Sequence, residues 1–137
     1  MIVTARLTFS AAHRLNNPNR DAEWNRRTYD KCDNPAGHGH NYALTVSVRG
    51  KIDPETGMVI DLKKLKEIVR RNVIDRVDHT NLNEDVDFLR EVIPTAENLA
   101  RAFWQQLAGA IAEGELYEVA LQETEKNSVV YRGEDEG

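Results

Sequence analysis

Apolar and polar residues alternate along two stretches of the chain, and this period of two predicts two long half-buried strands. In the first stretch one parity holds Val3, Ala5, Leu7, Phe9, Ala11 and His13. In the second, one parity holds His38, His40, Tyr42, Leu44, Val46 and Val48. Residues 50–57 then contain Pro54 and Gly57, which are typical of a turn.

A period near 3.6 predicts two helices in the second half of the chain. Residues 61–77 begin with Asp61 as the N-cap, and their apolar stripe consists of Leu62, Leu65, Ile68, Val69, Val73 and Val77. A polar connection leads to a second helix, capped by Thr95 and carrying Glu97 in its first turn. Two more strands are expected at residues 117–123 and 128–131.

This order, β-β-α-α-β-β, predicts an α+β fold with a four-stranded antiparallel sheet and two helices on one face. We expect a single domain over residues 1–133 and a solvated acidic tail over residues 134–137. One face and both edges of such a sheet stay exposed, so we expect association through edge strands. The segment 14–31 has a modest excess of positive charge and is expected to be a solvated, mobile loop.

Composition excludes several classes of protein. A formal net charge of -5 over 137 residues argues against a nucleic-acid partner. No apolar run approaches the roughly 20 residues of a membrane span, and the N-terminus does not resemble a signal peptide. A single cysteine cannot form an internal disulfide, so a cytoplasmic location is expected.

Three of the four histidines, His13, His38 and His40, fall on the apolar parity of their strands. A single core-facing histidine is usually just hydrogen-bonded, but three converging imidazoles would repel each other if they were protonated. A metal ion that binds the neutral rings removes this problem. Three imidazoles with a fourth position open suit catalytic zinc.

Cys32 lies in a polar segment beside Lys31 and shortly before His38. A nearby cation favours the thiolate, which would make Cys32 a reactive base. A fourth zinc ligand and an inert buried thiol are the two alternatives.

Two acidic positions also suggest chemistry. Glu123 continues the inward parity of its strand and suits a ligand with two adjacent N–H groups, or else a structural network. Asp78 precedes His79 just past a predicted helix end, where a carboxylate can orient a proton-transferring imidazole. An ordinary polar loop is the alternative for this pair.

Taken together, the segments FSAAHRL, KCDNPAGHGHNY, TGMVIDL, DHTNLN, PTAEN and ETEKNSVVY resemble the 6-pyruvoyltetrahydropterin synthase family. The resemblance runs from about Phe9 to Tyr131. It implies the tunnelling fold, with subunits joined edge to edge into a barrel. The usual assembly is a homohexamer of two stacked trimers, with active sites between subunits.

The resemblance also implies a role for each candidate residue. His13, His38 and His40 correspond to the zinc ligands, Cys32 to the catalytic cysteine, and His79 with Asp78 to the proton relay. Glu123 corresponds to the pterin anchor, and Thr95 and Glu97 to positions near the pterin. The implied reaction converts 7,8-dihydroneopterin triphosphate to 6-pyruvoyl-tetrahydropterin with elimination of triphosphate.

Two other functions remain open at this point. The 6-carboxytetrahydropterin synthases of the queuosine pathway act on the same substrate but release acetaldehyde. Five residues separate Cys32 from His38, and this gap is similar to that of the tetrahydrobiopterin branch. A non-catalytic zinc and pterin binding module is the second alternative, and the presence of both a candidate base and a relay pair disfavours it.

Overall fold

Two long antiparallel strands form the centre of the protein in the computed structural model, which describes residues 1–136. β1 (Ile2–His13) and β2 (His38–Arg49) pair along their full lengths. Side chains in β1 are alternately buried and exposed, as the period-two pattern predicts. This register places His13 directly opposite His38, so that the C-terminal end of one strand meets the start of the next.

Three further strands complete the sheet, in the order β3-β1-β2-β4-β5. β4 (Glu115–Gln122) pairs with β2, and β5 (Ser128–Tyr131) pairs with β4, both antiparallel. β3 (Thr80–Asn81) runs parallel to β1 at the opposite edge. The four predicted strands are confirmed. β3 was not predicted, because a strand of two residues is too short to show an alternating pattern.

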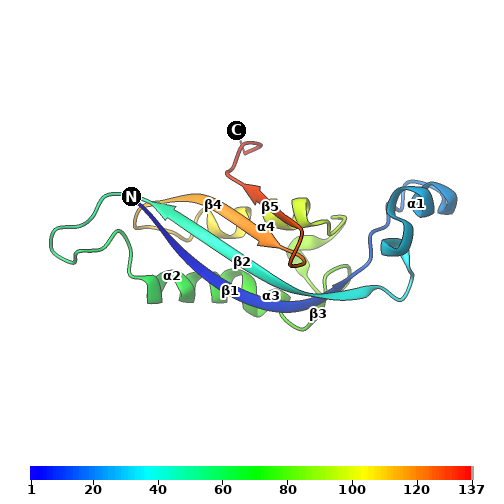
Figure 1. Cartoon of the computed structure of the whole chain (residues 1–137), viewed down its shortest axis with the longest axis horizontal. Coiled ribbons are helices and arrows are strands. Elements are labelled where there is room, and N and C mark those ends of the chain that lie inside the picture. The colour runs from blue at the N-terminus through cyan, green and yellow to red at the C-terminus, as the bar shows by residue number, and fades with distance from the viewer. Residues whose placement is uncertain (137) are drawn as a thin grey trace.

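The main helices cover one face of this sheet, as predicted (Figure 1). α2 (Leu62–Val69) continues through a π-helical turn, η2 (Arg70–Ile74), into the short α3 (Asp75–Val77). After the 3₁₀ turn η3 (Asp87–Leu89) comes α4 (Ala96–Leu107). The side chains of Asp61 and Thr95 cap α2 and α4, as expected, by accepting hydrogen bonds from backbone N–H groups.

The expectation of a mobile loop at residues 14–31 was wrong for much of that segment, because it contains the helix α1 (Ala22–Tyr29). Asp21 caps this helix, and the 3₁₀ turn η1 (Asp30–Asp33) follows it. Asn25, which is only 2% exposed, ties the helix to the preceding loop through hydrogen bonds with both backbone groups of Asn17. A single buried amide with several partners leaves no hydrophobic period in the sequence, which is why α1 was missed.

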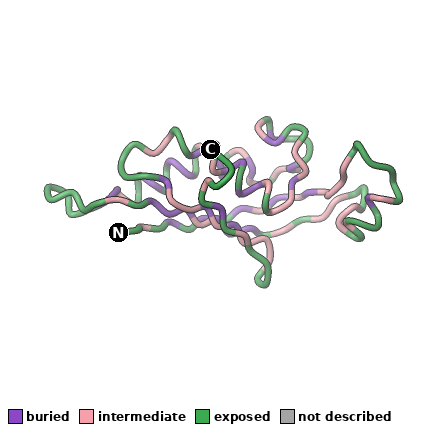
Figure 2. Tube along the Cα trace, turned by 90° about the horizontal axis from the view of Figure 1, so that it is seen from above, coloured by how far each residue is buried: buried purple, intermediate pink, exposed green. Residues whose placement is uncertain are grey.

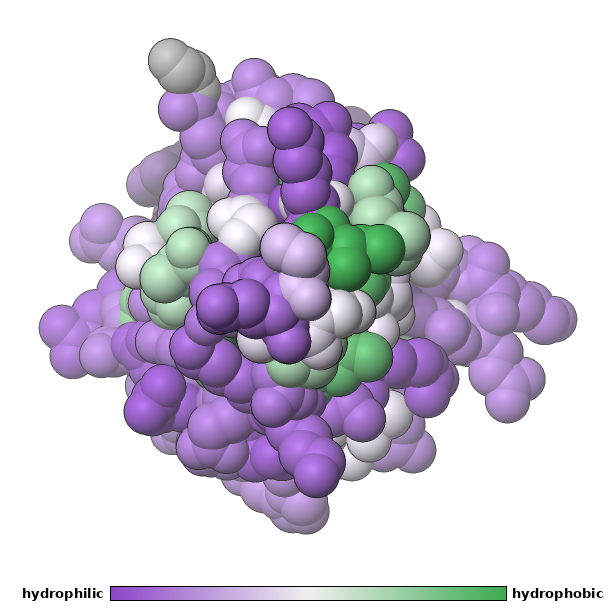
Figure 3. All heavy atoms as spheres, turned by 90° about the vertical axis from the view of Figure 1, so that its left-hand side faces the viewer, coloured by the Kyte–Doolittle hydropathy of each residue, from purple (hydrophilic) through white to green (hydrophobic). Residues whose placement is uncertain are grey.

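Buried residues concentrate where the sheet meets the helices, while the 50–57 turn and much of the α1 segment are exposed (Figure 2). The surface at the end that holds the N-terminus is mostly hydrophilic with small apolar patches (Figure 3). Within residues 1–136, no helix combines the length and apolar character needed to cross a membrane. The predicted acidic tail spans residues 134–137, of which Gly137 lies outside the described residues.

Candidate metal centre and its surroundings

The ring nitrogens of His13, His38 and His40 converge at one end of the β1–β2 pair. One nitrogen from each ring lies within 4.8 Å of the others, so the three histidines can hold a metal ion. The Nε2 atoms of His13 and His38 are 3.1 Å apart. The register explains this cluster, because His38 faces His13 across the strands and His40 follows two residues later on the same face.

His13 is held firmly from behind. Its side chain is 1% exposed, and its Nδ1 donates a hydrogen bond to the carbonyl oxygen of Pro94, 2.8 Å away. The hydroxyl of Tyr42 lies 3.4 Å from the same nitrogen. With the proton on Nδ1, the Nε2 atom carries the lone pair and faces the other two histidines.

Burial favours the neutral form of two of these rings, those of His13 and His40. Burial lowers the pKa of His13, although the Pro94 carbonyl and Glu123 oppose this effect in part. Burial also lowers the pKa of His40, against the opposing charge of Glu123. Neutral imidazole is the form that binds a metal ion.

His40 Nε2 is buried and has no hydrogen-bond partner among the described residues. Its nearest acidic atom is Oε1 of Glu123 at 3.8 Å, which is within reach of an ion pair but too far for a hydrogen bond. A buried ring nitrogen without a partner costs free energy unless a ligand satisfies it. The donor set therefore fits a metal ion that prefers imidazole nitrogen.

Glu123 lies immediately after β4, where the chain turns toward β5. Its backbone N–H donates to the carbonyl of Asn127 at 3.0 Å, which closes this hairpin. Because β4 pairs with β2, the turn carries the carboxylate to His40. The position of Glu123 beside His40 thus agrees with the prediction that it continues the inward face of its strand.

Asp78 and His79 form a pair at the β3 edge of the sheet. Oδ1 of Asp78 lies 3.0 Å from Nδ1 of His79 and also accepts the backbone N–H of Ser10 at 2.9 Å. The Ser10 hydrogen bond is the main cause that lowers the pKa of Asp78, and contact with His79 adds to it. The imidazole of His79 is 82% exposed, and its backbone has a positive φ of 61°.

His79 and His40 line the same depression, whose volume is about 420 Å³. Ser10 and Asn41, joined by a hydrogen bond of 2.6 Å, also line it. His79 and one member of the histidine cluster are therefore accessible from one depression of the surface.

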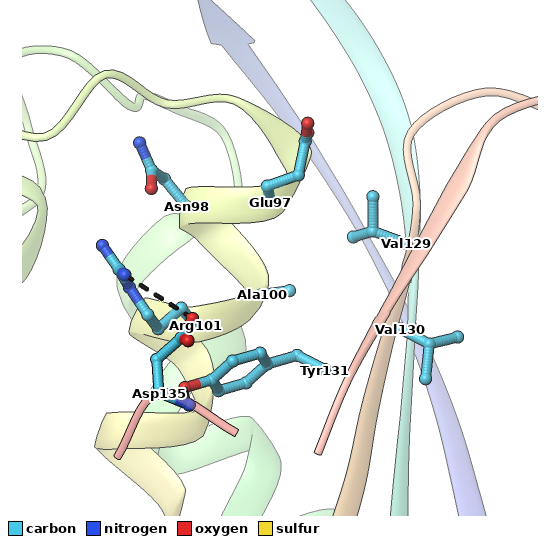
Figure 4. Close-up of a pocket in the computed structure, with 8 residues that line it drawn as sticks. All are labelled: Glu97, Asn98, Ala100, Arg101, Val129, Val130, Tyr131 and Asp135. Atoms are coloured by element: carbon cyan, nitrogen blue, oxygen red, sulfur yellow. Dashed lines mark hydrogen bonds and ion pairs between the residues drawn. The ribbon is translucent and has the colours of Figure 1, made fainter. Parts of the chain in front are cut away.

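The structure places the remaining predicted residues apart from this cluster. Cys32 is a free, partly exposed thiol in η1 and is not among the grouped metal-ligating atoms. Thr95 caps α4 directly after Pro94, the residue that binds His13. Glu97, in the first turn of α4, lines a cleft of about 170 Å³ between α4 and β5 (Figure 4).

Sequence reasoning missed the carbonyl of Pro94. A backbone oxygen carries no residue-type signal, and 81 residues separate it from His13. It also attached no role to Tyr42, although this residue shares the parity of His38 and His40.

The family model for 6-pyruvoyl tetrahydropterin synthase matches residues 2–134. The chain therefore belongs to the 6-pyruvoyl tetrahydropterin synthase family. It is 47% identical over 132 residues to the 6-pyruvoyl tetrahydrobiopterin synthase of Poecilia reticulata, covering 96% of this chain and 90% of that protein. It is 44% identical to the human protein of the same name, with 96% and 91% covered. The solved structure of 6-pyruvoyl tetrahydropterin synthase from Caenorhabditis elegans superposes with a TM-score of 0.89 at 43% identity, covering 97% of this chain and 96% of that one.

Proposed function

We propose that this protein is a zinc-dependent lyase that converts 7,8-dihydroneopterin triphosphate to 6-pyruvoyl-tetrahydropterin with elimination of triphosphate. One observation carries the proposal: the ring nitrogens of three histidines converge, and Nε2 of His40, which has no hydrogen-bond partner among residues 1–136, lies 3.8 Å from the carboxylate of Glu123. Relatives that are 44–47% identical over nearly the whole chain are named as this synthase.

His13, His38 and His40 would hold the zinc ion through their unprotonated ring nitrogens. When bound, zinc acts as a Lewis acid that acidifies the hydroxyl groups of the substrate side chain and the adjacent C–H bonds. Burial lowers the pKa of His13 and of His40, which favours their neutral forms, and the Pro94 carbonyl fixes the tautomer of His13. The ligands therefore need little rearrangement to bind the ion.

Two other residues would move protons, and a third would orient one of them. The Cys32 thiolate would remove a carbon-bound proton, and His79 would shuttle protons to and from the side chain. Asp78 accepts from His79 Nδ1, which leaves the other ring nitrogen of this exposed imidazole free for exchange. The backbone N–H of His79, a residue with positive φ, donates a hydrogen bond to the carbonyl oxygen of Ser10 at 2.6 Å.

Glu123 would anchor the pterin. One carboxylate accepts two parallel N–H bonds from the guanidine-like edge of the ring, which fixes the ring's orientation as well as its position. Its distance of 3.8 Å from His40 puts the anchor next to the metal ligands. Thr95 and Glu97 would contribute to substrate binding from the start of α4.

Product identification by mass spectrometry tests this function. Zinc-loaded protein is incubated anaerobically with 7,8-dihydroneopterin triphosphate, and we expect 6-pyruvoyl-tetrahydropterin and free triphosphate. Formation of the 6-carboxy product with acetaldehyde would assign the protein to the other branch. Stoichiometric uptake of the pterin without turnover would leave a binding module.

The Cys32→Ala variant tests the role of the thiol. We expect it to retain zinc and to lose most turnover, because the three imidazoles form the metal site without the sulfur. Loss of zinc from this variant would make Cys32 a ligand instead of a base.

We infer a homohexamer with active sites at subunit interfaces. The sheet ends in the four-residue β5 at one edge and the two-residue β3 beside β1 at the other, and free strand edges favour pairing. Sedimentation at assay concentrations tests this, and a monomer with full activity would contradict it.

The single cysteine also fits a reducing compartment, and we infer that the protein is located in the cytosol.

A further inference from the structure

The segment that carries Cys32 is conformationally unusual. Asp30, at its start, has φ 51° and ψ −124°, a backbone conformation that residues other than glycine rarely adopt. Gly37, at its end, has φ 72°. Glycine adopts such a φ without strain, but the strain at Asp30 persists only where surrounding contacts hold it. We therefore expect contacts from outside residues 30–37 to hold the backbone of this segment.

The contacts that do so come from the residues directly after β1. The N–H of Leu15 donates to the carbonyl of Cys32 at 2.8 Å. Nε of Arg14 donates to the carbonyl of Asp33, also at 2.8 Å, and its terminal nitrogen lies 3.0 Å from Oδ1 of the same residue. Asn16 donates from Nδ2 to that Oδ1 at 2.7 Å. Residues 14–16 thus bind the carbonyls of both Cys32 and Asp33.

Arg14 is itself anchored, so it can act as a fixed point. The backbone N–H of Arg14 donates to Oδ1 of Asn83 at 2.7 Å, and the backbone carbonyl of Arg14 accepts from Nδ2 of the same asparagine at 2.8 Å. Arg14 also follows His13 directly in the chain. The same stretch of backbone therefore carries a candidate metal ligand and the contacts that hold the thiol segment.

The Arg14–Asp33 pair is more enclosed than an ordinary surface ion pair. The side chain of Asp33 is 15% exposed and that of Arg14 is 35% exposed. Hydrogen bonds between charged partners that are partly shielded from water are stronger than exposed pairs. The planar guanidinium also reaches a carboxylate and a carbonyl together, which a lysine ammonium cannot do with the same geometry.

We propose that Arg14, acting through Asp33, is a positioning residue that holds the Cys32 thiol in a fixed place relative to the three histidines. The proposal rests on the proposed function, in which Cys32 is the base. Cys32 lies in η1, outside the sheet, so strand pairing does not fix its position. The ion pair between Arg14 and Asp33 and the hydrogen bonds around it fix the position of this base instead. Arg14 itself need not touch the substrate.

Cys32 is the only cysteine of the chain, so alkylation by iodoacetamide followed by mass spectrometry reports on this thiol alone. The variants to compare are Arg14→Met, which keeps an unbranched side chain but removes the guanidinium, Asp33→Ala, and the two combined. The matched control is Arg132→Met. Arg132 also binds one carboxylate, that of Glu118, through two nitrogens at 2.9 Å.

We expect Arg14→Met and Asp33→Ala to raise the rate of alkylation by about tenfold, because the released segment opens more often. At the same time kcat should fall on the order of 10- to 100-fold with KM nearly unchanged, because a misplaced base slows chemistry more than binding. Zinc content should stay at the wild-type value. The effect of the double variant should be smaller than the sum of the two single effects, because the contact between the guanidinium of Arg14 and Oδ1 of Asp33 is lost in both single variants.

Asp33→Asn provides the rescue, because its Oδ1 can still accept from Asn16 and Arg14. It should lie much closer to wild type than Asp33→Ala in both alkylation and turnover. Alkylation and kcat in Arg14→Met equal to those in Arg132→Met would overturn the proposal. If the wild-type protein forms no product, the proposed function fails, while the alkylation rates still decide whether Arg14 and Asp33 hold the thiol.

Discussion

The Nδ1 atom of His13 lies 2.8 Å from the carbonyl oxygen of Pro94, and this contact joins the end of β1 to the start of α4. The carbonyl can only accept, so the ring must donate from Nδ1 and present Nε2 to the metal site. In many proteins a hydrogen bond to the other ring nitrogen orients a metal-binding histidine in this way. The Ile93–Thr95 turn is therefore part of the candidate metal centre.

Asn98 should influence metal affinity, although it is no ligand. Its Nδ2 donates to the carbonyl of Ile93 at 2.9 Å, and its N–H donates to Oγ1 of Thr95. Asn98→Ala should loosen this turn and weaken zinc binding by about tenfold, because substitutions that disturb the hydrogen-bond partners of metal ligands lower metal affinity by this order. Competition with a chromophoric chelator measures the affinity.

The control for this substitution is Asn72→Ala. Asn72 makes the same type of bond, from Nδ2 to the carbonyl of Ile68 at 2.8 Å, but it lies in η2. It should lower stability without changing zinc affinity. Equal zinc affinities in the two variants would show that the Ile93–Thr95 turn has no role in the metal site.

Gly37 should be intolerant of a side chain for two separate reasons. Its φ is 72°, and a Cβ at this position would lie 3.1 Å from the carbonyl oxygen of His13. Gly57 has a similar φ of 74° but no atom within 4 Å of such a Cβ. Gly57→Ala should therefore cost about 1 kcal/mol of stability from the backbone alone. Gly37→Ala should cost more and should also weaken zinc binding, as urea unfolding and metal titration would reveal.

Removing zinc should lower the stability of the protein. Zinc at about 100 times its dissociation constant adds about 2.7 kcal/mol to the free energy of unfolding. A chelator should abolish this gain, and thermal unfolding with and without the chelator measures it. His38→Ala should unfold at the same temperature under both conditions, because only two of the three ring nitrogens remain. A chelator response of wild-type size in that variant would contradict the assignment.

Asp78 should make the protein more stable at neutral than at acidic pH. The N–H of Ser10 and contact with His79 lower its pKa in the folded state, so the unfolded chain takes up the proton first as the pH falls. Its contribution is complete above about pH 4 and is lost progressively below that value. Urea unfolding between pH 3 and pH 7 should give a shallower pH dependence for Asp78→Asn than for wild type. Asp75→Asn, at an exposed position three residues earlier, is the control, and identical slopes in the two variants would refute the role of Asp78.

The candidate site could be predicted from the sequence where it depends on strand parity. His13, His38 and His40 share the face of Leu7 and Leu44, and alternation alone places them there. Local sequence context identified Cys32, Asp78, His79 and Glu123 as candidates. Resemblance to the family supplied their roles and those of Thr95 and Glu97, and all these roles remain proposals. The sequence could not supply α1, because polar contacts of one buried asparagine hold its N-terminal end.

The sequence by itself determined four of the five strands, the two capped helices and the shared face of the three histidines. These follow from local preferences, since side chains two apart on a strand or four apart on a helix share a face whatever the rest of the chain does. Tertiary structure alone decided that Pro94 would orient His13, that Glu123 would approach His40, and that Arg14 would hold the segment of Cys32. Each of these contacts joins residues 19 or more positions apart, and such contacts depend on how the elements pack and not on their periodicity.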